Sequence, residues 1–134
     1  MTVRILLAED NDNLARLLAR FIESRGCEAV TASTGPQTVQ QLASGQFDLL
    51  FLDLGLPEIS GIEILRKIRT SSRLADLPVI IMTGIYKGEK YAQAAVRLGV
   101  RHYLEKPFSR EAFEAALNDT LASIEASRTK PTLL

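Results

Sequence analysis

The stretch that decides the fold is Asp48-Leu49-Leu50-Phe51-Leu52-Asp53, an apolar run framed by two carboxylates. Its shortness, and the turn-forming segment Leu54-Gly55-Leu56-Pro57 behind it, indicate a buried strand rather than a helix. In open parallel sheets, ligands gather just beyond the carboxyl ends of the strands, which is where Asp53 would lie. Taken alone, Asp53 is also an ordinary residue for starting a turn.

Four further apolar runs have the same character and alternate with segments of helical periodicity. The predicted strands cover residues 3–8, 27–32, 48–53, 79–83 and 100–105. Apolar residues at helical spacing follow each of them, with Leu14, Leu17, Leu18, Phe21 and Ile22 forming the first set. Strands alternating with helices, joined by right-handed crossovers, predict an α/β fold: a doubly wound (βα)5 unit with a five-stranded parallel sheet.

Length and composition fit one domain. The 134 residues are 46% hydrophobic and 24% charged, enough to bury a core without disulfides. Sixteen basic residues balance sixteen acidic ones, which gives no sign of direct nucleic-acid binding.

The apolar start reaches Glu9 too soon for a signal peptide or membrane span, and the lone Cys27 fits a reducing, cytoplasmic location. We expect a domain over residues 1–126 and a flexible tail or linker over 127–134.

Polar side chains follow four of the five predicted strands. They are Glu9 and Asp10, Asp53, Thr83, and Lys106. Because the carboxyl ends of parallel strands meet at one edge, these side chains should converge there. Three carboxylates repel one another unless a cation neutralises them. With one histidine and one cysteine in the chain, an oxygen-ligated ion such as Mg²⁺ is favoured over zinc.

This set of groups predicts a particular chemistry. An aspartate beside a metal, a hydroxyl and a lysine is suited to moving a phosphoryl group onto or off that aspartate. Each group also has an ordinary interpretation, since Glu9 and Asp10 could be acidic residues near a helix N-terminus and Lys106 a solvated surface charge. Independent turns rarely match at every position, so the whole set favours the functional interpretation.

The residues from Val3 to Ile124 resemble the receiver domain of response regulators, the phosphoaspartate switch of two-component signalling. The resemblance implies the flavodoxin-like strand order 2-1-3-4-5. It assigns the phosphoacceptor role to Asp53 and places Mg²⁺ on Glu9, Asp10, Asp53 and the backbone carbonyl of Gly55.

The same resemblance assigns supporting roles around the phosphoacceptor. Thr83 and Lys106 join Asp53 as catalytic residues, and Thr83 also acts as a switch together with the aromatic Tyr103. Lys106-Pro107-Phe108 matches the family's lysine turn, in which the peptide bond before proline is typically cis. Tyr103 is also understandable as a half-buried strand aromatic.

Two features depart from the commonest family pattern. Glu9 stands where aspartate is more usual, which implies an altered metal affinity rather than its loss. The segment 84–90 is about one residue longer than usual and carries two lysines, which affects where the fourth helix begins.

The implied function is Mg²⁺-dependent phosphoryl transfer from a phosphohistidine donor to Asp53, which switches the surface of the fourth helix, fifth strand and fifth helix. The partners would be a histidine kinase or histidine phosphotransfer protein, and a downstream effector or fused output domain. No membrane partner is expected, and a homodimer through the switched surface is left open. Such a protein is a signalling phosphoacceptor with self-catalysed phosphorylation and dephosphorylation rather than a conventional enzyme.

Two alternatives share the fold. A pseudo-receiver would signal by protein contact without phosphorylation, although the polar set is intact. A flavodoxin module would need a Ser/Thr/Gly-rich phosphate loop after the first strand, where this chain has Glu9-Asp10-Asn11-Asp12. We expect either a stand-alone receiver acting through partners or a receiver cut from a longer protein near Arg128.

Overall fold

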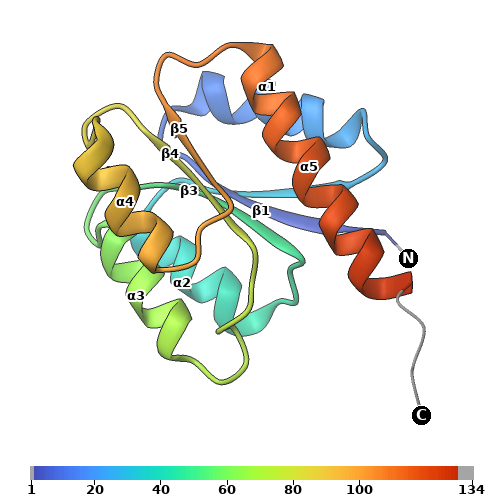
Figure 1. Cartoon of the computed structure of the whole chain (residues 1–134), viewed down its shortest axis with the longest axis horizontal. Helices are drawn as coiled ribbons and strands as arrows, with labels where there is room; N and C mark the ends of the chain where they lie inside the picture. Colours follow the sequence, from blue (N-terminus) through green and yellow to red (C-terminus); the bar gives the residue numbers. More distant parts are fainter. Residues whose placement is uncertain (1, 130–134) are drawn as a thin grey trace.

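The computed structural model describes residues 2–129, which form a five-stranded sheet with five flanking helices (Figure 1). The sheet order is β2-β1-β3-β4-β5, and every neighbouring pair is parallel. The strands are β1 (Arg4–Ala8), β2 (Glu28–Ala32), β3 (Leu49–Asp53), β4 (Val79–Thr83) and β5 (His102–Glu105). The helices are α1 (Asp12–Glu23), α2 (Gly35–Ser44), α3 (Gly61–Thr70), α4 (Glu89–Arg97) and α5 (Arg110–Thr129). The predicted fold class and strand order are confirmed.

The central strands are the most apolar because helices cover both of their faces. β3 and β4 are buried at every position, and β1 at every position after Arg4. The prediction was right for β4, whereas the other strands begin one or two residues later than expected. At β3 the reason is local: the Asp48 carboxylate accepts the backbone N–H of Arg4 at 2.8 Å, so this residue anchors the strand entry through its side chain.

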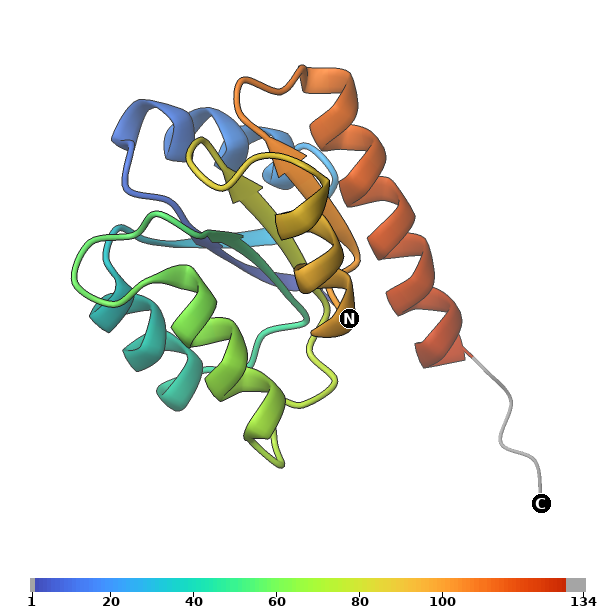
Figure 2. The ribbon, with the colours of Figure 1, turned by 60° about the vertical axis from the view of Figure 1, so that its left-hand side comes forward.

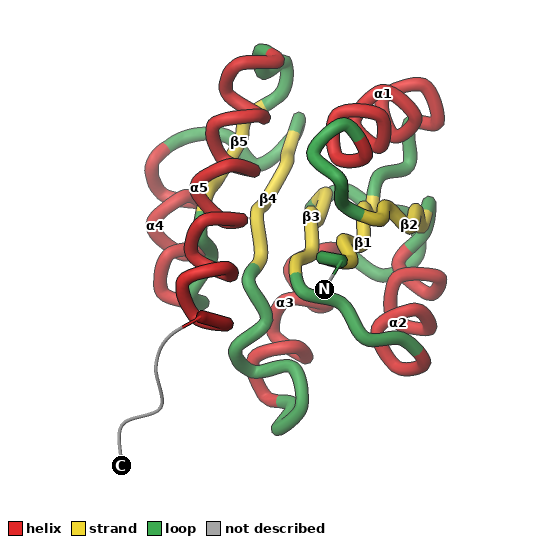
Figure 3. Tube along the Cα trace, turned by 90° about the vertical axis from the view of Figure 1, so that its right-hand side faces the viewer, coloured by secondary structure: helices red, strands yellow, loops and turns green. Residues whose placement is uncertain are grey.

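The sheet separates two hydrophobic cores, one on each face. Figure 3 shows the strands with the helices around them, turned by 90° from Figure 1. On one face, α1 and α5 contribute Leu18, Ile22, Phe113 and Leu117, and the stacked rings of Phe51 and Phe113 lie 4.7 Å apart. On the other face, α2 and α3 supply most of the helical side chains of the core, and α4 lies on that side as well (Figure 2). Burial on both faces fixes the sheet as a rigid platform for the strand ends.

Side-chain caps begin the helices where the sequence favours them. The Asn11 side chain accepts the N–H of Leu14 at α1, and Thr34 accepts that of Gln37 at α2. At the start of α5, the Ser109 hydroxyl accepts the N–H of Ala112 at 3.0 Å.

One expectation about the helices was wrong. Leu17, assigned to the apolar face of the first helix, is 47% exposed. Periodicity marks an apolar stripe but does not show how wide a stripe the sheet covers. The last helix continues to Thr129, past the predicted boundary at residue 126, while the rest of the predicted tail, 130–134, lies outside the described residues.

Two glycines hold the loop after β3 close to its neighbours. A Cβ on Gly61 would lie 2.5 Å from the Asp53 carbonyl oxygen, and a Cβ on Gly35 would lie 2.4 Å from the Ile59 carbonyl oxygen. Only glycine permits these approaches. Because glycine stands at these two positions, the starts of α2 and α3 pack directly against the backbone of the loop that begins at Asp53.

None of the helices within residues 2–129 is long and apolar enough to cross a membrane.

Candidate functional site

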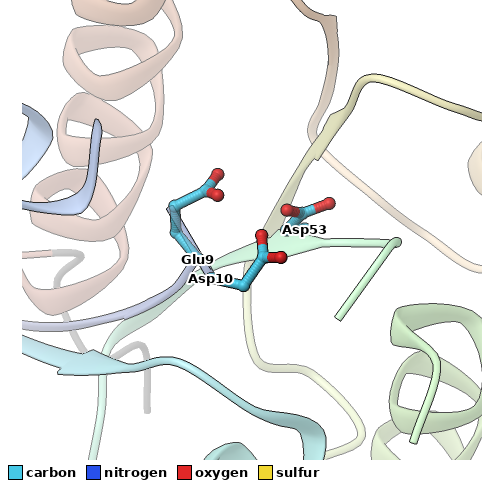
Figure 4. A group of neighbouring side chains, drawn as sticks. All are labelled: Glu9, Asp10 and Asp53. Carbon is cyan, nitrogen blue, oxygen red and sulfur yellow. The ribbon is translucent and has the colours of Figure 1, made fainter. Parts of the chain in front are cut away.

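Three carboxylates meet at the carboxyl-terminal edge of the sheet (Figure 4). Glu9 and Asp10 directly follow β1, and Asp53 is the last residue of β3. One oxygen from each carboxylate lies within 4.8 Å of the others. The neighbouring positions of β1 and β3 in the sheet bring together residues that are more than forty positions apart.

Lys106 supplies the positive charge next to these carboxylates. Its ammonium lies 2.6 Å from Glu9 Oε1 and 3.0 Å from Asp53 Oδ2. The backbone N–H of Lys106 donates to the Thr83 carbonyl at 2.7 Å, and the Lys106–Pro107 peptide bond is cis. Burial alone would lower the pKa of the Lys106 ammonium, but its hydrogen bonds to Glu9 and Asp53 outweigh burial and raise that pKa.

Glu9 is the most deeply placed of the three carboxylates, with 1% of its surface exposed. Its Oε2 accepts the backbone N–H of Asn11 at 3.0 Å, while Oε1 pairs with Lys106. Burial raises the pKa of the Glu9 carboxyl, since the contacts with Lys106 and Asn11 offset only part of the desolvation cost. This carboxylate is therefore the one that gains most from a further cation.

Asp53 is held by its own loop and by Lys106. Its Oδ1 accepts the backbone N–H of Gly55 at 2.9 Å, and its Oδ2 receives the lysine. Exposure of Asp53 is 4%. The side chain of Ile85 lies over this loop, because a Cβ placed on Gly55 would be 3.1 Å from Ile85 Cδ1.

Thr83, the fully buried last residue of β4, directs its hydroxyl toward the loop that follows. Thr83 Oγ1 accepts the backbone N–H groups of Ile85, at 3.2 Å, and Tyr86, at 2.9 Å. The Tyr103 hydroxyl in turn donates to the Tyr86 carbonyl. Burial, followed by the nearby charges of Glu105 and Tyr91, raises the pKa of Tyr103 to about 12.

The structure thus brings Glu9, Asp10, Asp53 and Lys106 together, whereas Thr83 and Tyr103 meet at the loop between β4 and α4. Sequence reasoning missed Ile85 and Tyr86 as parts of this arrangement. The only indication in the sequence was their position, two and three residues after Thr83. Their side chains did not distinguish them from residues of an ordinary loop.

The donor set fits a hard divalent cation. All three side chains offer carboxylate oxygens, the ligands that Mg²⁺ prefers, and proteins usually bind this ion through one or two carboxylates together with waters and phosphate oxygens. The single lysine charge does not balance three carboxylates that lie this close.

The response regulator receiver domain model matches residues 5–118. The chain belongs to the response regulator receiver family. The chemotaxis protein CheY of Pseudomonas aeruginosa is 32% identical over 110 residues, which are 81% of this chain and 88% of that protein. The transcriptional regulatory protein CrdR of Helicobacter pylori is 32% identical over 117 residues, 87% of this chain and 54% of that protein. The receiver therefore spans about half the length of such a transcriptional regulator.

A solved structure agrees on the fold. The CheY-like response regulator receiver domain protein from Methanospirillum hungatei superposes with a TM-score of 0.84 at 22% identity, covering 95% of this receiver and 99% of that chain.

Proposed function

We propose that this receiver domain accepts a phosphoryl group on Asp53 from the phosphohistidine of a histidine kinase or a histidine phosphotransfer protein. The observation that carries the proposal is the contact of the Asp53 carboxylate with the Lys106 ammonium at 3.0 Å, inside a group of three carboxylates. A carboxylate so placed has a cation ready for the incoming phosphoryl oxygens.

In the transfer, a carboxylate oxygen of Asp53 attacks the phosphorus and the phosphorus–nitrogen bond of the donor breaks. The electron pair of that bond stays on the imidazole nitrogen, and the product on this chain is an acyl phosphate. Lys106 moves from pairing with Asp53 to pairing with the phosphoryl oxygens. Mg²⁺, held by Glu9, Asp10, Asp53 and the Gly55 carbonyl, would supply neutralisation of the same oxygens. In the return step, water attacks the phosphorus of the acyl phosphate, inorganic phosphate leaves and the Asp53 carboxylate is restored.

The switch follows from the hydrogen bonds of Thr83. When the hydroxyl moves toward Asp53 to donate to a phosphoryl oxygen, it leaves the N–H groups of Ile85 and Tyr86, which it now accepts. Tyr86 also carries the carbonyl that receives the Tyr103 hydroxyl. Movement of Thr83 therefore disturbs the contact that holds Tyr103, and phosphorylation reaches the surface of α4, β5 and α5 through this loop.

This surface is where effector proteins, or a second copy of the receiver, would bind. Two large apolar side chains of α4 are exposed, namely Tyr91 at 43% and Val96 at 66%. Exposed apolar groups gathered on one side are a common feature of protein-binding surfaces. In a longer regulator, a fused output domain would be the partner.

The test is incubation with acetyl phosphate, with and without Mg²⁺, followed by intact-mass measurement. Wild type and Asp12→Asn, an exposed acidic residue of α1, should gain one phosphoryl mass only with Mg²⁺, and Asp53→Asn should gain none. A phosphohistidine donor protein serves as a second source of phosphate. Labelling of Asp53→Asn would contradict the assignment, and failure of both donors to label wild type would leave a receiver that signals without phosphorylation.

A further inference from the structure

A second hollow lies at the opposite edge of the sheet, where β3, β4 and β5 begin. It has a volume of about 960 Å³ and is enclosed by the loop before β3, the segment after α3, the end of α4 and the last turns of α5. Its apolar lining includes Phe47, Leu74, Leu77 and Ile124. A cavity of this size falls in the range that binds small organic molecules.

Five arginines line the hollow: Arg69, Arg73, Arg97, Arg101 and Arg128. They come from three of these segments, since the loop before β3 contributes none, so the fold and not a basic sequence motif gathers them. Two aspartates, Asp48 and Asp76, are the acidic residues among the lining residues.

Two of the five guanidinium charges are paired with carboxylates. Arg101 lies 3.0 Å from Asp119, and Arg128 lies 2.6 Å from Asp48. These pairs leave Asp76 as the lining carboxylate without an ion pair among the described residues.

The other three arginines form no ion pair within residues 2–129, although the charge of Asp76 acts on Arg69. Arg69 donates to the carbonyl oxygens of Ala75, Leu77, Leu98 and Gly99.

Arg73 likewise donates to the carbonyl oxygens of Leu42 and Gly45. Carbonyl groups orient a guanidinium but do not cancel its charge. The guanidinium of Arg97 forms no hydrogen bond or ion pair within residues 2–129. Three unpaired guanidinium groups therefore face a hollow that holds one unpaired carboxylate.

Positive charge on the walls of a partly enclosed, low-dielectric hollow attracts anions more strongly than the same charge on an open surface. Guanidinium groups also match the geometry of phosphate oxygens, with which they form paired hydrogen bonds. Apolar side chains next to them provide a surface for the uncharged part of a ligand.

We propose that this hollow is a binding site for an organic phosphate of nucleotide size, whose phosphates contact Arg97 and its neighbouring arginines and whose body lies on the apolar lining. The site is separate from the carboxylate edge and does not depend on phosphorylation of Asp53.

The experiment is a titration of ¹⁵N-labelled full-length protein with ADP, followed by amide chemical shifts. It is done without Mg²⁺, so that the carboxylate edge stays negative and repels the phosphates. Signals from residues 97–101, and from Gln46 across the hollow, should shift with saturation. Adenosine, which lacks the phosphates, should bind at least about tenfold more weakly, as loss of charge-assisted hydrogen bonds implies.

Matched variants locate the charge. Arg97→Gln should weaken ADP binding about tenfold with an unchanged unfolding midpoint, since this exposed side chain forms no hydrogen bond or ion pair within residues 2–129. Arg20→Gln, an equally exposed arginine on α1, should bind as wild type does. Absence of shifts at millimolar ADP, equal binding of adenosine, or an Arg97→Gln variant that binds as tightly as wild type would each overturn the proposal.

Discussion

A carboxylate with 1% of its surface exposed needs a cation within reach, and Glu9 has the Lys106 ammonium 2.6 Å away. That ammonium is shared with Asp53, 3.0 Å from it on the other side. One positive charge between two carboxylates, with Asp10 close by, leaves an excess of negative charge. In the metal-free protein, the carboxylates that would hold Mg²⁺ therefore repel one another, and this repulsion destabilises the folded state.

Replacement of Glu9 by glutamine should reduce the stabilisation that Mg²⁺ provides. Wild type should gain about 2.7 kcal/mol in free energy of unfolding at a hundredfold excess of Mg²⁺ over its Kd, because the ion binds only the folded state. Glu9→Gln should gain less at the same Mg²⁺ concentration, since one ligand charge is lost. Urea unfolding over a Mg²⁺ series measures the gain. Glu23→Gln, an exposed carboxylate of α1, is the control, and an equal gain in Glu9→Gln and wild type would remove Glu9 from the metal site.

Tyr103 offers a prediction in alkaline solution. Its pKa of about 12 lies above the ordinary value of 10.0, first because the ring is partly buried and then because Glu105 and Tyr91 are near. A raised pKa means that the contribution of the neutral phenol to stability is fully present below pH 10 and is lost as the pH rises through 12.

The measurement is the difference in ultraviolet absorbance between wild type and Tyr103→Phe during a pH titration, with circular dichroism to show that both remain folded. The difference should develop near pH 12. A difference that develops at pH 10 would mean that Tyr103 is freely solvated.

At the scale of the elements, the contact between the start of α3 and the end of β3 decides how Asp53 is placed. Replacement of Gly61 by alanine should destabilise the protein by about 1–3 kcal/mol, because the added Cβ would lie 2.5 Å from the Asp53 carbonyl oxygen. Helix propensity alone predicts the opposite sign, since alanine is favoured over glycine within a helix.

Gly84→Ala is the matched control, because its Cβ would meet only Lys106 side-chain carbons, at 3.7 and 3.8 Å. Chemical denaturation of both variants compares an added Cβ that meets backbone with one that has room. If Gly61→Ala were as stable as Gly84→Ala, the loop after β3 would have enough freedom to move away, and Asp53 would not be rigidly positioned.

Elements whose residues are buried on both faces were the ones that sequence could predict. β3 and β4 are continuous apolar runs, so their existence and the location of Asp53 and Thr83 at their ends follow from the pattern. The exposure of Leu17 could not be predicted, because it depends on how α1 rotates against the sheet. The bridging position of Lys106 between Glu9 and Asp53 likewise depends on distances across three strands.

At the scale of the whole molecule, the two edges of the sheet carry opposite charge. The carboxyl-terminal edge gathers three carboxylates around one lysine, and the opposite edge gathers five arginines with two aspartates. The formal net charge of zero conceals this separation, since composition counts charges without placing them. The acidic edge could be predicted from the sequence because its carboxylates stand at the ends of predicted strands. The basic edge could not be predicted, because its arginines lie in segments that no sequence pattern connects.

The end of α5 ties this basic edge to the start of β3. Arg128 lies 2.6 Å from Asp48 Oδ1, and the other oxygen of Asp48 accepts the backbone N–H of Arg4. One side chain thus connects the first strand, the central strand and the last helix. The predicted domain boundary at residue 126 falls before Arg128, so a protein ended there would lack this contact.

Ending the chain at residue 126 should therefore lower the free energy of unfolding by about 0.5–1 kcal/mol, the upper range for an ion pair that is partly shielded from water. Arg128→Gln in the full chain should lose the same amount, and Arg66→Gln, an exposed arginine of α3, should lose almost nothing. Urea denaturation at low and high salt measures all three, and the two losses should shrink together as salt screens the pair. A truncation that costs far more than Arg128→Gln would show that the last helical turn stabilises the domain through contacts other than this ion pair.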